Sequence, residues 1–145
     1  MSRVIVDLGW EYTLKTAWSD ALAPTSEFIV GLYHDATDDI QPDDDLAAIT
    51  TRPAGSGYAD QTPAAADFAP EYIGSEWQST TDVVVFDVSD STRTVDSYFV
   101  GANFLAEGDS SASDHLLATG ALTDIIDLSA YDTTFEPNNV GVVSE

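Results

Sequence analysis

The charge balance constrains this chain more than any other feature of its sequence. It carries 26 acidic and 4 basic residues, a net charge of −22 at pH 7 over 145 residues. Such a charge opposes compaction in dilute buffer, whereas in molar salt the Debye length falls to about 3 Å and the repulsion is screened. With 43% hydrophobic residues, 10% of the chain being aromatic, a core can still form, which argues against disorder. We therefore expect a folded protein adapted to concentrated salt, with most of its acidic side chains solvated.

The same composition argues against several classes of function. Nucleic-acid binding depends on Lys and Arg meeting phosphates, and this chain has only 4 such residues. Without cysteine, it has no disulfide scaffold, no thiol nucleophile and no Cys-ligated metal site. No apolar run is long enough to span a membrane, and the first residues do not resemble a secretory signal. We expect neither a nucleic-acid partner nor a membrane.

The first part of the chain predicts one helix, over residues 7–22. Its apolar face would consist of Trp10, Leu14, Trp18, Ala21 and Leu22, which recur at helical spacing. Asp7 is the expected N-cap, and Pro24 follows the expected end. We expect the apolar face to anchor the helix on a sheet, and a surface that stacks a ligand is the alternative.

The rest of the chain predicts mainly β structure. Residues 27–34 form an apolar run of strand length, apolar on both faces, which predicts a central strand. Residues 83–136 predict antiparallel strands joined by turns. The expected strands there cover residues 83–88, 94–105, 116–122 and 125–128. Together these features predict a single domain, residues 1–145: a small antiparallel β-sandwich with one N-terminal α-helix packed on it.

Two segments remain open at this stage. Residues 35–82 are polar and Pro-rich and predict a long loop, although a structureless loop of this length is unusual in a compact domain. The loop either contains short strands, around Gly57–Ala59 and Tyr72–Ile73, or reaches out to a neighbouring molecule. The C-terminal tail, residues 137–145, is either a last strand of the same subunit or an arm laid on a partner.

Several short segments follow one another in an order that is also found in a family of viral proteins. The segments are Gly9 with the helix after it, Phe28–Tyr33, Pro42–Leu46, Gly57–Ala59, Val83–Asp90, Tyr98–Gly101 and Leu116–Ala118. Their order resembles that of small structural proteins encoded by tailed phages and their archaeal counterparts. Members of this family are virion components, at the capsid surface or along the tail and baseplate. With the salt adaptation, the resemblance implies a tailed virus or provirus of a salt-loving archaeon, and it implies no catalytic residues.

Two acidic clusters are candidate sites for a divalent cation. The first consists of Asp43, Asp44 and Asp45, in a run that also holds Asp35, Asp38 and Asp39. The second, weaker cluster consists of Asp109, Asp114 and His115. Carboxylates suit Mg²⁺ and Ca²⁺, but an Asp-rich composition also produces such clusters by itself, and the order of an EF-hand loop is absent. We expect no other cofactor.

The catalytic motifs that a sequence can reveal are missing. There is no Gly-x-Ser-x-Gly elbow and no Gly-rich phosphate loop. His34 and His115 are the only histidines, and a Ser–His–Asp set around either is not excluded by counting. Since no motif completes a catalytic constellation, we expect that the protein is not an enzyme.

The expected working surface is an interface. Its candidates are the loop aromatics Tyr58, Phe68, Tyr72 and Trp77 and the tail residues Val140, Val142 and Val143. Aromatic residues are enriched at interface cores, and an alternating tail suits strand addition to a neighbour. The alternatives are that the aromatics plug the ends of the sandwich and that the tail pairs within its own subunit.

These features together predict a virion protein that associates with itself. We expect it to be made in the cytoplasm of a halophilic host and to dock on the major capsid protein as a decoration or turret subunit. The alternative is a tail, baseplate or fibre component, docked on tail proteins, that binds a host receptor or glycan.

Overall fold

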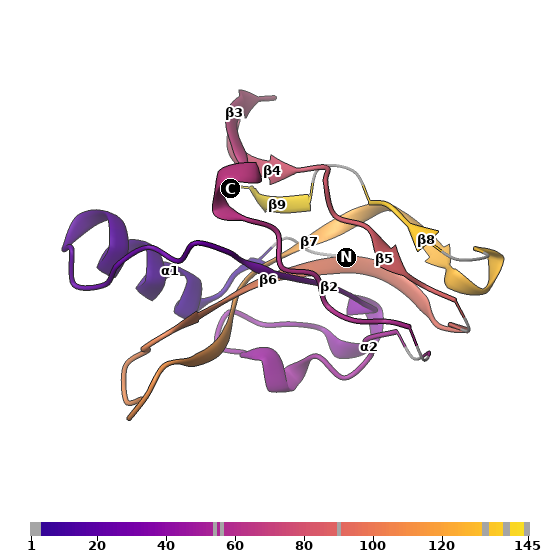
Figure 1. Cartoon of the computed structure of the whole chain (residues 1–145), viewed down its shortest axis with the longest axis horizontal. Helices are drawn as coiled ribbons and strands as arrows, with labels where there is room; N and C mark the ends of the chain where they lie inside the picture. The colour runs from indigo at the N-terminus through magenta and orange to yellow at the C-terminus, as the bar shows by residue number, and fades with distance from the viewer. Residues whose placement is uncertain are drawn as a thin grey trace.

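The structure is a computed structural model, and it describes residues 4–53, 55, 57–89, 91–131, 134–137 and 140–143. The fold is mainly β, with antiparallel sheets and one N-terminal helix, as predicted (Figure 1). The largest sheet has the order β1 (Val4–Ile5), β7 (Ser113–Asp127), β6 (Thr94–Phe104), β2 (Ile29–Tyr33). A second sheet has the order β3 (Ala69–Ile73), β4 (Glu76–Thr81), β9 (Val140–Val143), and β5 (Phe86–Asp87) pairs with β8 (Thr134–Phe135).

The four-stranded sheet lies between two layers (Figure 1). On one face, Val30, Leu32 and Val100 are buried against side chains of the two smaller sheets, among them Phe86 and Val140. On the other face, Tyr33 and Phe99 are buried against Ile40 and Ile49, which belong to the segment between β2 and β3. This arrangement agrees with the predicted sandwich.

The β6–β7 hairpin forms the centre of the sheet, and β2, which was expected to be a central strand, lies at its edge. β7 is one continuous strand of 15 residues, so the two strands expected at 116–122 and 125–128 are a single strand. Gly120 does not interrupt it; a Cβ there would lie 2.2 Å from the Tyr98 ring, so the glycine makes room for that ring. The strong strand expected at 83–88 is reduced to the two residues of β5.

The N-terminal helix is shorter than predicted, and it buries a different face from the one expected. α1 covers Asp7–Thr13 and continues as a π-helical turn, η1, over Leu14–Trp18. Val6, not Asp7, occupies the N-cap position. The helix packs on β7 through Gly9, where a Cβ would lie 2.1 Å from the carbonyl oxygen of Leu117. Because α1 comes very close to β7 at Gly9, the face of the helix that carries Gly9 points to the sheet, and the expected apolar face points away from it.

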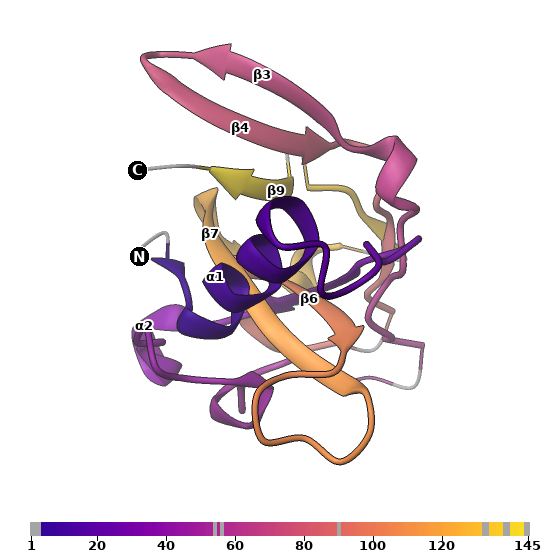
Figure 2. The ribbon, with the colours of Figure 1, turned by 90° about the vertical axis from the view of Figure 1, so that its left-hand side faces the viewer.

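The stretch expected as a long loop is largely ordered into short elements. It holds α2 (Asp35–Asp38), the 3₁₀ turns η2 (Leu46–Ala48) and η3 (Ala65–Asp67), and the hairpin of β3 and β4. Gly74 and Ser75 form the two-residue turn of this hairpin, both with positive φ (60° and 69°), which is the backbone of a tight hairpin turn. We call the β3–β4 hairpin the arm; Figure 2 shows it standing off the body above β9 and α1.

The tail forms a strand within its own subunit. β9 pairs with β4, with Val140 opposite Thr81 and Val142 opposite Ser79. Asp90, residues 138–139 and residues 144–145 lie outside the described part of the chain. In the part that is described, no helix has the length and apolar character to cross a membrane.

Candidate functional site

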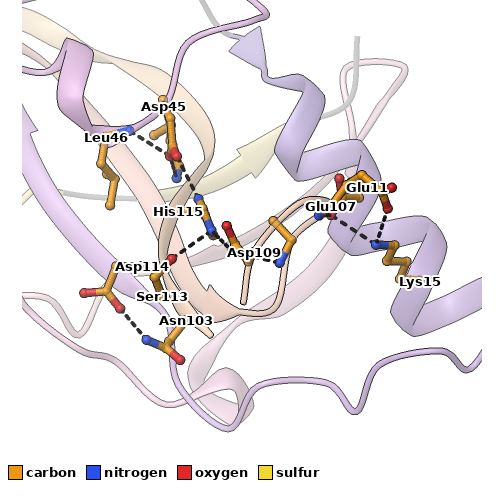
Figure 3. Close-up of polar contacts among 12 residues, drawn as sticks. Glu11, Lys15, Asp45, Leu46, Asn103, Glu107, Asp109, Ser113, Asp114 and His115 are labelled. Atoms are coloured by element: carbon orange, nitrogen blue, oxygen red, sulfur yellow. Dashed lines mark hydrogen bonds and ion pairs between the residues drawn. The ribbon is translucent and has the colours of Figure 1, made fainter. Parts of the chain in front are cut away.

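His115 lies at the centre of a cluster of charged and polar side chains, which we call the His115 clamp (Figure 3). Its Nδ1 is 2.7 Å from Oδ2 of Asp45, and its Nε2 is 2.7 Å from Oδ2 of Asp109 and 3.1 Å from Oγ of Ser113. Asp45 also accepts hydrogen bonds from the backbone N–H groups of Leu46 and Leu116. The clamp therefore joins the segment before η2, strand β7 and the turn between β6 and β7.

The two carboxylates control the protonation of the ring. Burial by itself would lower the pKa of His115, but hydrogen bonds to Asp45 and Asp109 outweigh it and raise the pKa. Burial would likewise raise the pKa of Asp45, but the N–H group of Leu116 and the ring of His115 outweigh it and lower the pKa. The favoured state is an imidazolium between two carboxylates.

Ser113, His115 and Asp45 lie in the order of a Ser–His–Asp set, with a carboxylate on Nδ1 and a hydroxyl on Nε2. A catalytic histidine must accept the hydroxyl proton on Nε2. Here the carboxylate of Asp109 is closer to Nε2 than the hydroxyl is, and it favours a proton that stays on that nitrogen. The geometry of the clamp thus suits a structural ion pair better than a base that activates Ser113.

Several of the acids proposed as metal ligands accept hydrogen bonds from N–H and O–H donors of the protein itself. Asp38 accepts hydrogen bonds from the backbone and hydroxyl groups of Thr50 and Thr51, and Asp44 accepts one from the N–H of Gln41. Asp45 belongs to the His115 clamp. Among the described residues, no group of three or more His, Asp or Glu side chains is placed to hold a metal ion. Asp43, Asp44 and Asp45 therefore do not converge on a common point.

The second acidic cluster is divided in the same way. Asp109 binds His115, whereas Asp114 accepts a hydrogen bond from the side-chain amide of Asn103 across the hairpin. The other histidine, His34, lies elsewhere, with Nδ1 2.8 Å from the Thr37 hydroxyl.

A second polar group ties the same β6–β7 turn to α1 (Figure 3). The carboxylate of Glu11 accepts a hydrogen bond from the N–H of Glu107 at 2.8 Å and lies 3.3 Å from Nζ of Lys15. Lys15 also lies 3.7 Å from the carboxylate of Glu107. The turn is thus held from two sides, by the clamp and by α1.

Two of the four loop aromatics proposed for an interface pack inside the subunit. The ring of Tyr58 stacks on Phe86, and its hydroxyl accepts a hydrogen bond from the N–H of Leu32 and donates one to Asp60. Burial raises the pKa of Tyr58, and the charge of Asp60 adds to this. Phe68 packs edge-on against Phe28. Both residues complete the core, which is the alternative to an interface that the sequence left open.

The other two aromatics lie on the arm and face solvent. Tyr72 and Trp77 are cross-strand partners with ring centroids 5.4 Å apart. Tyr72, Ile73 and Trp77, which we call the arm patch, keep 61%, 54% and 60% of their surfaces exposed. Of the tail residues, Val140 is fully buried in the core, and Val142 and Val143 are half-buried in β9. The tail therefore contributes less open surface than the sequence suggested.

A second exposed apolar surface lies on α1 and η1, where the sequence favoured a buried anchor and left an exposed stacking surface as the alternative. Trp10, Leu14 and Trp18, which we call the helix patch, keep 52%, 54% and 81% of their surfaces exposed. These are the residues expected to anchor the helix, and Gly9 explains the difference, because the close approach to β7 puts Gly9 and Tyr12 on the buried side. The sequence did contain a sign of this orientation, because Gly9 is a small residue next to the apolar face.

An apolar crevice runs between the helix and the sheet that carries the arm. One hollow of about 200 Å³ is lined by Tyr12 and Thr13 of α1, by Leu117 and by Val142 of β9. A second, of about 160 Å³, shares Val142 and Phe28 with the first. Because alternate residues of a strand share a face, Trp77 lies on the same face of β4 as Ser79, the partner of Val142. Trp77 and its cross-strand partner Tyr72 therefore continue the sheet face that forms one wall of the crevice, whereas Ile73 lies on the opposite face of the arm.

Comparisons of the chain with models of protein families, with curated proteins and with solved structures give no match.

Proposed function

We propose that this protein is a structural subunit of the virion of a tailed virus that infects a salt-loving archaeon. Its place would be the capsid surface, as a decoration or turret subunit. The resemblance of its ordered segments to small virion proteins supports this proposal, and so does the net charge of −22, which suits concentrated salt. No part of the proposal depends on catalysis.

The observation that carries the proposal is the arm. A folded chain gains little from holding Tyr72, Ile73 and Trp77 in solvent, since burying one aromatic side chain stabilises by about 2 kcal/mol or more. Large exposed apolar groups on a projecting hairpin are typical of contacts with another molecule. In molar salt such contacts persist, because they do not depend on charge.

The direct test is to locate the protein in virus particles. Antibodies raised against the recombinant chain would be applied, with gold labels, to particles purified in molar NaCl from the host that carries the gene. Label over the capsid is expected, and label over the tail would favour the alternative position. Purified particles that contain no peptide of this chain by mass spectrometry would refute the proposal.

The role of the arm is tested by Trp77→Ala. We expect the variant to fold like the wild type, since Trp77 is exposed, but to assemble at least tenfold more weakly. Val83→Ala is the matched control, because Val83 is similarly exposed (56%) but lies outside the arm. If Trp77→Ala assembles as strongly as the wild type, measured by light scattering after size exclusion, the arm is not part of the interface.

The alternative, a tail or fibre component that binds a glycan, also has one observation in its favour. The tilted pair of Tyr72 and Trp77 is an exposed aromatic surface of the kind on which sugar rings stack. A saturable change in Trp fluorescence on titration with glycans of the host surface, lost in Trp77→Ala, would support it.

A further inference from the structure

The arm and α1 form the two sides of one apolar corner. Tyr72 and Trp77, which we call the aromatic pair, continue the sheet face on which Ser79 and Val142 line the crevice. The crevice separates this face from α1. In Figure 2 the arm stands above α1, with β9 between them. The aromatic pair is thus the outer part of one wall of the corner.

The helix patch begins at the other lip of the crevice. Gly9 and Thr13 of α1 line the crevice. Trp10 and Leu14 each follow one of these residues by a single position, which is a turn of about 100° around the helix. Lys15 lies on the other flank of the helix, toward the β6–β7 turn. Trp10 and Leu14 are therefore exposed beside the crevice, across from the wall that carries the aromatic pair.

We propose that this corner is a single docking groove, and that its occupant is a segment of the particle protein on which the subunit docks. The segment is uncharged and carries large apolar side chains on two faces, one against the aromatic pair and the other against the helix patch. The inference rests on the proposed function, because it says what the exposed arm contacts. It follows that the assembly which Trp77→Ala weakens is assembly with that protein.

The exposed area requires contact with both walls. A buried aromatic side chain contributes about 150–250 Å², so Tyr72 and Trp77 at their observed exposure offer roughly 250 Å². Trp10 and Trp18 offer about as much. A standard interface takes about 800 Å² from each partner, so either wall alone falls well short. The two walls, with Leu14 and the lining of the crevice, come much closer to it, and one segment seated between them covers both.

The lining of the crevice specifies the chemistry of the occupant. Its two hollows, of about 200 and 160 Å³, are lined by described residues none of which is charged, although 26 of the 145 residues of the chain are acidic. A cavity of about 150 Å³ holds a benzene molecule, so each hollow has room for one large apolar side chain. An uncharged contact of this kind keeps its strength in molar salt, because it does not depend on ion pairs.

The arm of a second copy does not have this chemistry. The cross-strand pairs place Tyr72 and Trp77 on one face of the arm. Glu71, Ile73 and Glu76 lie on the opposite face. Seated between the two walls, such an arm would place carboxylates against an apolar surface, which costs free energy unless each charge is paired. The groove is therefore assigned to a different protein.

Variants of the two walls test the groove. Each variant, carrying a peptide tag, would be expressed in the infected host beside the wild-type chain, and the ratio of the two forms in particles purified in molar NaCl would be measured by mass spectrometry. Leu14→Asp and Tyr72→Asp each place a carboxylate on one wall, and each should be depleted at least tenfold relative to the tagged wild type. Ile73→Asp is the matched control, because Ile73 is similarly exposed (54%) but lies on the other face of the same arm; it should be taken up like the wild type.

The outcomes separate the models. Depletion of Tyr72→Asp but not of Leu14→Asp would leave the arm alone as the contact and overturn the groove, and equal depletion of Ile73→Asp would overturn it too. Light scattering in molar NaCl identifies the occupant: a wild-type dimer that both wall variants dissociate would overturn the assignment to a different protein. Thermal unfolding of the three variants should match that of the wild type, since these side chains are exposed.

This experiment fails separately from the test of the proposed function. Particles that contain the chain but take up all three variants like the wild type would keep the proposed function and remove the groove. Particles that contain no peptide of the chain would remove the proposed function, and this inference with it.

Discussion

The His115 clamp makes the stability of this protein depend on pH in a direction that can be stated in advance. The hydrogen-bonded pair of His115 and Asp45 joins residues that lie 70 positions apart in sequence. A hydrogen bond between charged groups is worth about 1.5–3 kcal/mol. The Asp45 side chain is 36% exposed, however, so screening reduces the value to about 1–2 kcal/mol. The free energy of unfolding of such domains is about 5–15 kcal/mol, so a change of this size is measurable.

The sign follows from the raised pKa of His115. The unfolded histidine titrates near its usual value of about 6.5, so the contribution of the clamp is complete below that pH. The contribution is lost as the pH rises through the higher pKa of the folded state. The lowered pKa of Asp45 keeps its carboxylate charged in mildly acidic solution. We therefore expect His115→Gln to be less stable than the wild type by about 1–2 kcal/mol near pH 6, and by clearly less near pH 9.

Urea unfolding at constant molar NaCl, followed by Trp fluorescence and repeated between pH 5.5 and 9.5, measures this difference. His34→Gln is the matched control, since the chain has 2 histidines; this variant should keep the pH dependence that His115→Gln loses. A difference between wild type and His115→Gln that stays constant, or that grows as the pH rises, would refute the argument.

Three further predictions concern packing and charge. Gly9→Ala should destabilise the fold by about 2–4 kcal/mol, because its Cβ would meet the carbonyl of Leu117, and thermal unfolding will show whether it does. Tyr58→Phe should cost about 1–3 kcal/mol by leaving the N–H of Leu32 without its acceptor, whereas Tyr72→Phe, exposed on the arm, should change stability by less than about 0.5 kcal/mol. The free energy of unfolding of the wild type should rise between 0.1 M and 2 M NaCl, and a flat dependence would contradict the role given to screening.

The fold class could be predicted because it depends on local patterns. The alternation of residues 94–105 and the apolar run of residues 27–34 each specify a strand by themselves. The helix was found by its period but assigned the wrong buried face, because its position is set by the contact of Gly9 with β7. Periodicity identifies a face as apolar, and only the tertiary contact decides whether that face is buried.

The candidate sites were harder to predict, because their residues come from distant segments. Asp45 and His115 belonged to two separate acidic clusters in the sequence, and folding joins them into one clamp. Tyr58 and Trp77 looked alike as isolated aromatics in a polar stretch, yet one fills the core and the other lies on the arm. Gly74–Ser75, between Tyr72–Ile73 and Glu76–Trp77, was the local sign that a hairpin turn was present.

The scarcity of basic residues also limits where trypsin can cut this protein. Trypsin cuts after Lys and Arg unless a Pro follows, so Pro53 protects Arg52 and the sequence offers only three positions: Arg3, Lys15 and Arg93. One of them is held by structure, because Lys15 lies in η1 against Glu11. Cleavage after Lys15 requires local opening of the fold, so its rate reports how often that region unfolds. Limited digestion can thus follow the helix without any label, and a partner seated on α1 would slow the cut after Lys15 first.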